Sequence, residues 1–173
     1  MSYDVIGAMA RSYLEFPVQP VLADRVVCTW IDRRNGLHPV LPDACIDLVW
    51  DGEQLGVAGP DTRAWDVDAT KTYVCIRFRP GAAPGVFGVP ASELVDQDIA
   101  LADIWGAARA RALEDQLAAA ALEAAPRIME AALVPTWRMP RLLMRWSARC
   151  YARCTPRIFQ TRRSCNASPP ERD

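Results

Sequence analysis

The sequence contains one histidine, no long apolar run and no basic, apolar start, and each absence excludes a class of protein. His38 alone cannot supply the several imidazoles of a histidine-based metal centre. A histidine-based catalytic triad also needs a nucleophile beside the imidazole, and no such pairing is visible. Because His38 precedes Pro39 in an expected loop, we predict that it lies at the surface. We therefore expect no metal, no cofactor and no enzymatic activity.

No stretch approaches the roughly 18–20 apolar residues that a membrane helix requires. The first residues, Met1 to Asp4, lack the positive charge and the apolar segment of a secretion signal. We therefore expect a cytoplasmic protein without a membrane partner.

Six cysteines in a chain without an export signal indicate reduced thiols rather than a disulfide framework. Cys28, Cys45 and Cys75 lie in apolar runs, where we expect them to be small buried side chains. Cys150 and Cys154 have a C-x-x-x-C spacing, but no fourth ligand or nearby histidine completes a zinc site.

The charges are divided unevenly along the chain. Residues 1–126 hold 18 acids and 10 bases, whereas residues 127–173 hold 3 acids and 10 bases, all of them arginine. The overall composition, 51% hydrophobic and 24% charged, is that of a globular protein. These numbers predict an acidic folded body, large enough for one domain, followed by a basic tail.

The most informative stretch is residues 45–50, which is rich in strand-forming side chains and is followed by Asp51-Gly52. Asp-Gly is a strong signal for a tight hairpin turn. Strand side chains alternate, so two faces follow. They are Ile46, Leu48 and Trp50 on one side, and Cys45, Asp47 and Val49 on the other. One apolar face and one face with a single carboxylate indicate the wall of a small β-sandwich or barrel.

Other segments extend this pattern into an α+β fold, with strands first and helices last. After an extended stretch up to residue 24, strands are predicted at residues 25–31, 54–58 and 73–79. Residues 37–40 are expected to follow a turn at Asn35-Gly36 and to lead into the strand at 45–50. Brief helices follow within residues 94–105. An alanine-rich helix begins at Ala107, and Pro126 should end or kink it. Residues 61–71 are polar, with Trp65 as their one large apolar side chain, and we assign no strand there.

Five residues of these strands are candidates for a ligand site, because pockets are mostly apolar with a few fixed polar groups. They are Trp30, Asp47, Trp50, Tyr73 and Arg77. Phe78 could line the same pocket, but aromatic side chains on alternating strands more often form plain core.

Asp47 must face water or pair with a base, and we favour a structural pair with Arg77 or Arg79 over a ligand contact. If the pocket exists, Arg77 should select an anionic or polar effector. Asp43 is expected to organise a turn. Along one strand it would lie about 13 Å from Asp47, too far for an acid and base pair.

The order of motifs over residues 10–133 resembles the amino-terminal domain of AraC-type bacterial transcriptional regulators. The motifs are Tyr13 to Trp30 with its prolines, Leu41 to Trp50, Gly59-Pro60, Arg77-Phe78-Arg79-Pro80-Gly81, and Leu101-Ala102-Asp103-Ile104-Trp105-Gly106. The resemblance implies a cupin-like β-sandwich or barrel that senses a small molecule or mediates homodimer formation. It also implies helices that lead to a DNA-binding domain with two helix-turn-helix units.

The resemblance and the pattern together divide the chain into three parts. We expect a cupin-like β-domain at residues 1–105, linker helices at residues 106–134 and an irregular basic tail at residues 135–173. Only 39 residues follow Val134, too few for two helix-turn-helix units. The expected function is therefore that of an effector-sensing or dimerisation domain without its own DNA-binding domain. The alternative is a free-standing cupin-like binding protein that has no role at DNA.

We expect that a change of reading frame near Pro135 replaced the DNA-binding half. Trp137, Met139, Met144 and Trp146 each have a single codon, and read in another frame these codons with GC-rich neighbours give Leu-Ala and Asp-Ala. Resequencing the gene downstream of codon 134 should reveal a neighbouring reading frame that encodes helix-turn-helix sequence. A continuous reading frame, with no helix-turn-helix sequence encoded in the neighbouring frames, would contradict this hypothesis.

Overall fold

The computed structural model describes residues 12–34, 36–138 and 163–164 of the chain. Six strands form an antiparallel sheet in the order β1-β2-β7-β4-β5-β8, and three form a second sheet in the order β3-β6-β9. The first sheet contains β1 (Tyr13–Phe16), β2 (Val26–Asp32), β7 (Tyr73–Phe78), β4 (Asp47–Trp50), β5 (Leu55–Ala58) and β8 (Asp98–Ala100). The second contains β3 (Gly36–Val40), β6 (Trp65–Ala69) and β9 (Arg163–Ser164).

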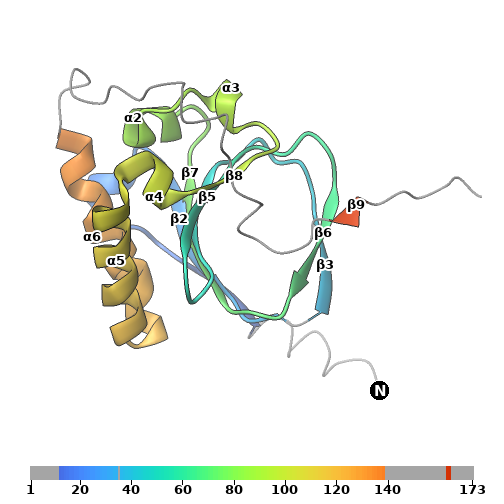
Figure 1. Cartoon of the computed structure of the whole chain (residues 1–173), viewed down its shortest axis with the longest axis horizontal. Coiled ribbons are helices and arrows are strands. Elements are labelled where there is room, and N and C mark those ends of the chain that lie inside the picture. The colour runs from blue at the N-terminus through green and yellow to red at the C-terminus, as the bar shows by residue number, and fades with distance from the viewer. Residues whose placement is uncertain (1–11, 35, 139–162, 165–173) are drawn as a thin grey trace, which may run out of the picture.

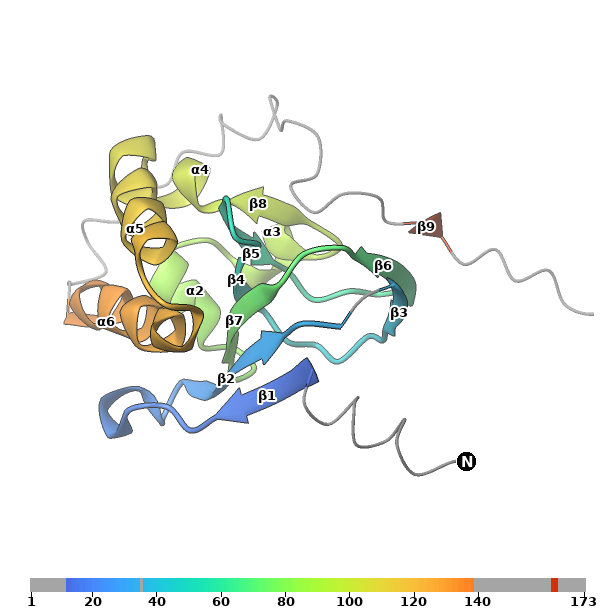
Figure 2. The ribbon, with the colours of Figure 1, turned by 90° about the horizontal axis from the view of Figure 1, so that it is seen from below.

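Most of the helices come after β7, and together with the antiparallel sheet they agree with the α+β class. The helices are η1 (Pro20–Leu22), α2 (Ala83–Phe87), α3 (Ala91–Leu94), α4 (Leu101–Trp105), α5 (Ala107–Ala119), η2 (Leu122–Ala124) and α6 (Ala125–Arg138). Helices α5 and α6 lie together over one side of the large sheet, and β3 and β6 lie on its other side (Figures 1 and 2). The large sheet is therefore the middle layer of the fold.

The side of the large sheet toward the helices carries the main core. Val74, Ile76 and Phe78 alternate along β7 and are at most 1% exposed. They belong to one cluster with Leu117 of α5 and Met129 of α6. Burial of these side chains, at about 25 cal/mol for each Å² of apolar surface, holds the helices against the sheet.

The predicted hairpin at Asp51-Gly52 is confirmed. Asp51 follows β4, and its Oδ1 accepts hydrogen bonds from the backbone N–H groups of Glu53 (2.9 Å) and Gln54 (2.8 Å). Gly52 has a φ of +95°, which glycine adopts without strain. Burial raises the pKa of Asp51, but Lys71 and the two backbone N–H groups outweigh it, so the pKa lies below its usual value.

The short strands β3, β6, β8 and β9 were not predicted from the sequence. The polar segment 61–71 contains β6, which pairs with β3, and the helical stretch 94–105 is interrupted by β8. The predicted strand at 45–50 begins only at Asp47, because Ala44 has a φ of +57° and turns the chain just before it.

The helical end departs from the predicted boundaries in one respect. Helix α5 ends at Ala119, and Pro126 stands in the first turn of α6, where its missing N–H costs nothing. Helix α6 then continues past Val134 through Pro135 to Arg138. Of the tail at 135–173, residues 139–162 and 165–173 lie outside the described residues, and so do Cys150 and Cys154. Within the described part of the chain, every helix is too short or too polar to cross a bilayer.

Gly59, directly after β5, is packed too closely for any side chain. A Cβ at this position would lie 1.6 Å from the carbonyl oxygen of Leu94. We expect Gly59→Ala to lower the free energy of unfolding by about 3 kcal/mol or more, because the backbone of either segment must shift. Urea unfolding followed by circular dichroism measures this effect.

Gly85→Ala, within α2, is the matched control. The added Cβ would meet only Nη1 of Arg25, at 3.5 Å. This change should leave the stability unchanged or raise it by about 0.5–1 kcal/mol. Equal stabilities of the two variants would contradict the close packing of Gly59 against Leu94.

Candidate functional site

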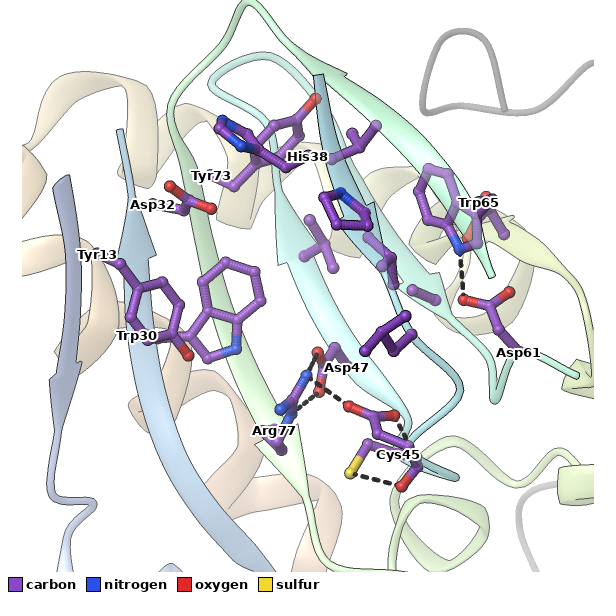
Figure 3. Close-up of a pocket in the computed structure, with 18 of the residues that line it drawn as sticks. Tyr13, Trp30, Asp32, His38, Cys45, Asp47, Asp61, Trp65, Tyr73 and Arg77 are labelled. Carbon is purple, nitrogen blue, oxygen red and sulfur yellow. Dashed lines mark hydrogen bonds and ion pairs between the residues drawn. The ribbon is translucent and has the colours of Figure 1, made fainter. Parts of the chain in front are cut away.

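A cavity of about 400 Å³ lies between the two sheets (Figure 3). Its volume is within the usual range for small-molecule sites. The large sheet contributes the side of its strands that faces away from the helices, and the facing wall comes from β3 and β6. The cavity is thus built by the same alternation that builds the core, on the opposite side of the sheet.

Strand register places the residues on this side of the large sheet in three rows, and all of those named below except Cys28 and Cys75 line the cavity. In the first row Cys28, Arg77, Asp47, Ala58 and Asp98 are successive partners from β2 to β8. In the second row Trp30, Cys75 and Val49 are partners, and in the third row Tyr13, Asp32 and Tyr73 are partners. An apolar middle row therefore separates two rows that carry charged groups.

Arg77 is the centre of the first charged group. Its Nε donates to Oδ1 of Asp47 at 3.2 Å, and its Nη2 donates to Oδ2 of Asp47 at 3.0 Å. The same Nη2 lies 3.1 Å from Oδ2 of Asp43. The predicted pair of Asp47 with Arg77 is confirmed, and one guanidinium serves two carboxylates.

The expected separation of Asp43 and Asp47 along an extended strand was wrong. The chain turns at Ala44, and Oδ1 of Asp43 accepts the backbone N–H of Cys45 at 2.9 Å. Asp43 therefore does organise a turn, as predicted, and the turn brings its carboxylate to Arg77.

Burial and ion pairing shift the pKa values of Asp47 and Arg77 in opposite directions. Burial raises the pKa of the Asp47 carboxyl, and the hydrogen bonds and the positive charge of Arg77 oppose the rise. For Arg77, burial disfavours the charged form, but Asp47 and then Asp43 outweigh it and raise its pKa. The guanidinium stays charged, and a bidentate pair of this kind keeps the carboxylate ionised at neutral pH.

A second charged group lies at the other end of the cavity. Nε of Arg34 lies 2.8 Å from Oδ2 of Asp32, which is 6% exposed. The Arg34 guanidinium also lies 5.4 Å from the ring centroid of Tyr13, whose ring is 5.6 Å from that of Trp30. A cation is thus already held between a carboxylate and an aromatic face at this end.

The facing wall comes from two strands whose inward residues are paired. His38 is the partner of Val67, and Val40 is the partner of Trp65. Nε1 of Trp65 donates to Oδ2 of Asp61 at 2.7 Å, which fixes the indole ring. The prediction that His38 lies at the surface was wrong. It is half-buried in β3 and lines the cavity.

Two buried ring nitrogens that belong to lining residues have no hydrogen-bond partner among the described residues. They are Nε1 of Trp30 and Nε2 of His38. A buried N–H without a partner costs about 1–3 kcal/mol. A ligand that carries an acceptor oxygen would recover this free energy at Trp30.

The cysteines close to the cavity are poor nucleophiles. Burial is the largest cause that raises the pKa of Cys28, Cys45 and Cys75, and for Cys75 the pKa lies well above its usual value. All three are therefore thiols at neutral pH, whereas a nucleophile must be a thiolate. Cys28 and Cys75 are buried as predicted, but Cys45 is only half-buried and lines the cavity.

Four of the five predicted site residues line this cavity, namely Trp30, Asp47, Tyr73 and Arg77. Trp50 does not. It is packed in the core on the helix side of the sheet. Asp47 and Val49 of the same strand point to the opposite side and line the cavity. Because Trp50 shares the face of Leu48, the alternation of the strand itself places it away from Asp47.

Sequence reasoning missed most of the facing wall and the Asp32 end. The segment from Trp65 to Ala69 alternates apolar and acidic side chains, which is the signal for a half-buried strand. That signal could have placed Trp65 and Val67 on one face. No comparable signal marks Asp98, because the register of β8 depends on tertiary pairing with β5.

Residues 14–100 match the family model of a domain of unknown function, DUF6597. The chain belongs to this family. No curated protein and no solved structure gave a significant match.

The DUF6597 match contains nearly all of the strands that form the large sheet, from β1 to β8. Every cavity-lining residue except Tyr13 also falls within it. Helices α4, α5 and α6 lie after the matched region. The DUF6597 region therefore coincides with the part of the fold that holds the cavity.

The ion pair yields a stability prediction. We expect Arg77→Met to lower the free energy of unfolding by about 2–3 kcal/mol, because it leaves the buried Asp47 carboxylate without its partner. The double variant Asp47→Leu with Arg77→Met should recover most of this loss, since it removes both charges. Chemical unfolding of the three proteins measures the difference. A double variant less stable than Arg77→Met alone would contradict the assignment.

Proposed function

We propose that the chain is a cytoplasmic effector-sensing or dimerisation domain of an AraC-like transcriptional regulator, and that its effector binds in the cavity between the sheets. The β-body is in this reading cupin-like. The observation that carries the proposal is the cavity itself, with its apolar middle row between two fixed charged groups. Such a combination of apolar walls and a few oriented polar groups is typical of small-molecule sites.

Binding without turnover agrees best with the side chains present. The cysteine thiols are protonated, and Arg77 and Asp47 are engaged with each other. Catalysis by nucleophile and base requires the two groups to lie within hydrogen-bond reach. Cys45 is the one thiol among the described lining residues, and its contact with Asp43 raises its pKa further, so it stays protonated. We infer that the ligand leaves unchanged.

The large sheet offers a direct route from the cavity to the helices. Along β7, Tyr73 and Arg77 line the cavity, and Val74 and Ile76 face the core that contains residues of α5 and α6. A ligand that binds one arrangement of the sheet more tightly would shift the population toward it. The helices would then transmit that arrangement to a partner copy or to a DNA-binding domain.

A free-standing binding protein remains the second candidate, and one observation favours it. The cavity is lined by residues between Tyr13 and Asp98, so it is complete without α4, α5 or α6. Ligand binding therefore does not depend on an output element. In either case, we propose that contact with DNA would require a separate helix-turn-helix domain joined to this chain.

The proposal predicts that filling the cavity abolishes ligand binding. Ala58 lies in the first row beside Asp47, and Ala58→Phe would place a ring in the cavity. We expect this variant to lose at least about tenfold in affinity for ligands identified from a metabolite library by native mass spectrometry. Ala108→Phe, on the exposed surface of α5, is the matched control and should bind normally.

The two candidates separate when the full chain is fused to the helix-turn-helix half of an AraC-type regulator. A sensory domain should make reporter expression depend on the ligand, and Ala58→Phe should remove that dependence. Ligand binding with constant reporter expression would favour the free-standing protein. Unchanged binding in Ala58→Phe would contradict the cavity as the site.

A further inference from the structure

The charges that line the cavity are unbalanced. Five carboxylates face it, those of Asp32, Asp43, Asp47, Asp61 and Asp98. They are accompanied by two guanidiniums, Arg34 and Arg77, so the formal charge of the described lining residues is −3 with His38 neutral. A low-dielectric cavity strengthens such a field, which attracts cations and repels anions.

Arg77 cannot reverse this sign. Its Nη2 lies 3.0 Å from Asp47 and 3.1 Å from Asp43, so one positive charge is already matched by two negative charges. An anionic ligand at Arg77 would have to displace a carboxylate held by a bidentate contact. Arg77 was expected to select an anionic or polar effector, and this geometry argues against the anionic class.

Aromatic rings occupy both walls of the same cavity. Tyr13, Trp30 and Tyr73 come from the large sheet, and Trp65 comes from the facing sheet (Figure 3). Aromatic faces stabilise an ammonium group, most strongly when it is removed from water. The Arg34 guanidinium over Tyr13 is an example of this contact within the protein.

The carboxylates are spread around the walls and do not converge on one point. Among the described residues, no group of three His, Cys, Asp or Glu side chains could hold a metal ion. The electric field of these carboxylates is better matched by an organic cation with an apolar body than by a bare metal ion. The buried, unpartnered N–H of Trp30 adds a donor, which suits a ligand with an acceptor oxygen.

From these features we propose that the cavity selects an organic cation, an ammonium group on an apolar or aromatic body that also carries an acceptor oxygen. This inference rests on the proposed function, because it names the ligand class of the same cavity. The charge is held by the acidic walls and the aromatic faces, and the apolar body lies along Trp30 and Val49 of the middle row.

Three probes of one shape test the sign of the charge: 2-phenylethylamine, 2-phenylethanol and phenylacetate. Binding to the full chain is measured by titration calorimetry. We expect the amine to bind at least about tenfold more tightly than the alcohol, and phenylacetate to show no binding up to about 10 mM. Equal or tighter binding of the alcohol or of phenylacetate, or no binding of the amine, would overturn the inference.

Asp43→Asn is the informative variant, because Asn still accepts the backbone N–H of Cys45 and keeps the turn while one charge is removed. It should weaken binding of the amine by about fivefold and leave the alcohol unchanged. Asp115→Asn, an equal change of charge on the exposed side of α5, should alter neither. Equal weakening by both variants, or none by Asp43→Asn, would contradict the role of the cavity field.

The failure of this inference differs from the failure of the proposed function. If phenylacetate binds and Ala58→Phe abolishes its binding, the cavity is a ligand site for anions and not for cations. If no probe and no metabolite binds in a way that Ala58→Phe changes, the cavity is not a ligand site, and both proposals fall.

Discussion

The alternation of side chains across a single sheet is the constraint on which the structure depends. Strand β7 lies between β2 and β4, and each of its residues must serve one of two faces. Val74, Ile76 and Phe78 build the core under the helices, and Tyr73 and Arg77 build the cavity wall. Since the period is two, a shift of one residue in register would exchange core and cavity throughout the sheet. The fold and the candidate site are therefore specified together.

At the ion pair of Arg77, this alternation places charged side chains in a buried position, which costs desolvation free energy. Burial of Asp47 disfavours its charge, and the bidentate contact offsets that cost only while both partners remain. The turn at Ala44 adds the carboxylate of Asp43 to the same guanidinium. The result is a polar end of the cavity that is rigid and carries an excess of negative charge. A rigid charged end orients a ligand, and its excess charge favours ligands of the opposite sign.

Sequence patterns predicted the parts of the fold that local chemistry determines. Asp51-Gly52 located the hairpin, alternation separated Leu48 from Asp47, and the need for a partner linked Asp47 to Arg77. What could not be predicted depends on contacts between distant segments. The pairing of β3 with β6 turns His38 from an expected surface residue into part of a wall, and the turn at Ala44 changes the position of Asp43. Trp50 was assigned to the site by residue type, although the same alternation excludes it.

The central claim is that ligands enter between the two sheets and do not approach the helix side. Two-dimensional NMR of the indole N–H signals tests it most directly, with 2-phenylethylamine as the titrant. The account predicts that the signals of Trp30 and Trp65 shift in a saturable manner, while those of Trp50 and Trp105, which pack in or against the core, stay in place. Saturable shifts confined to Trp50 and Trp105 would contradict it.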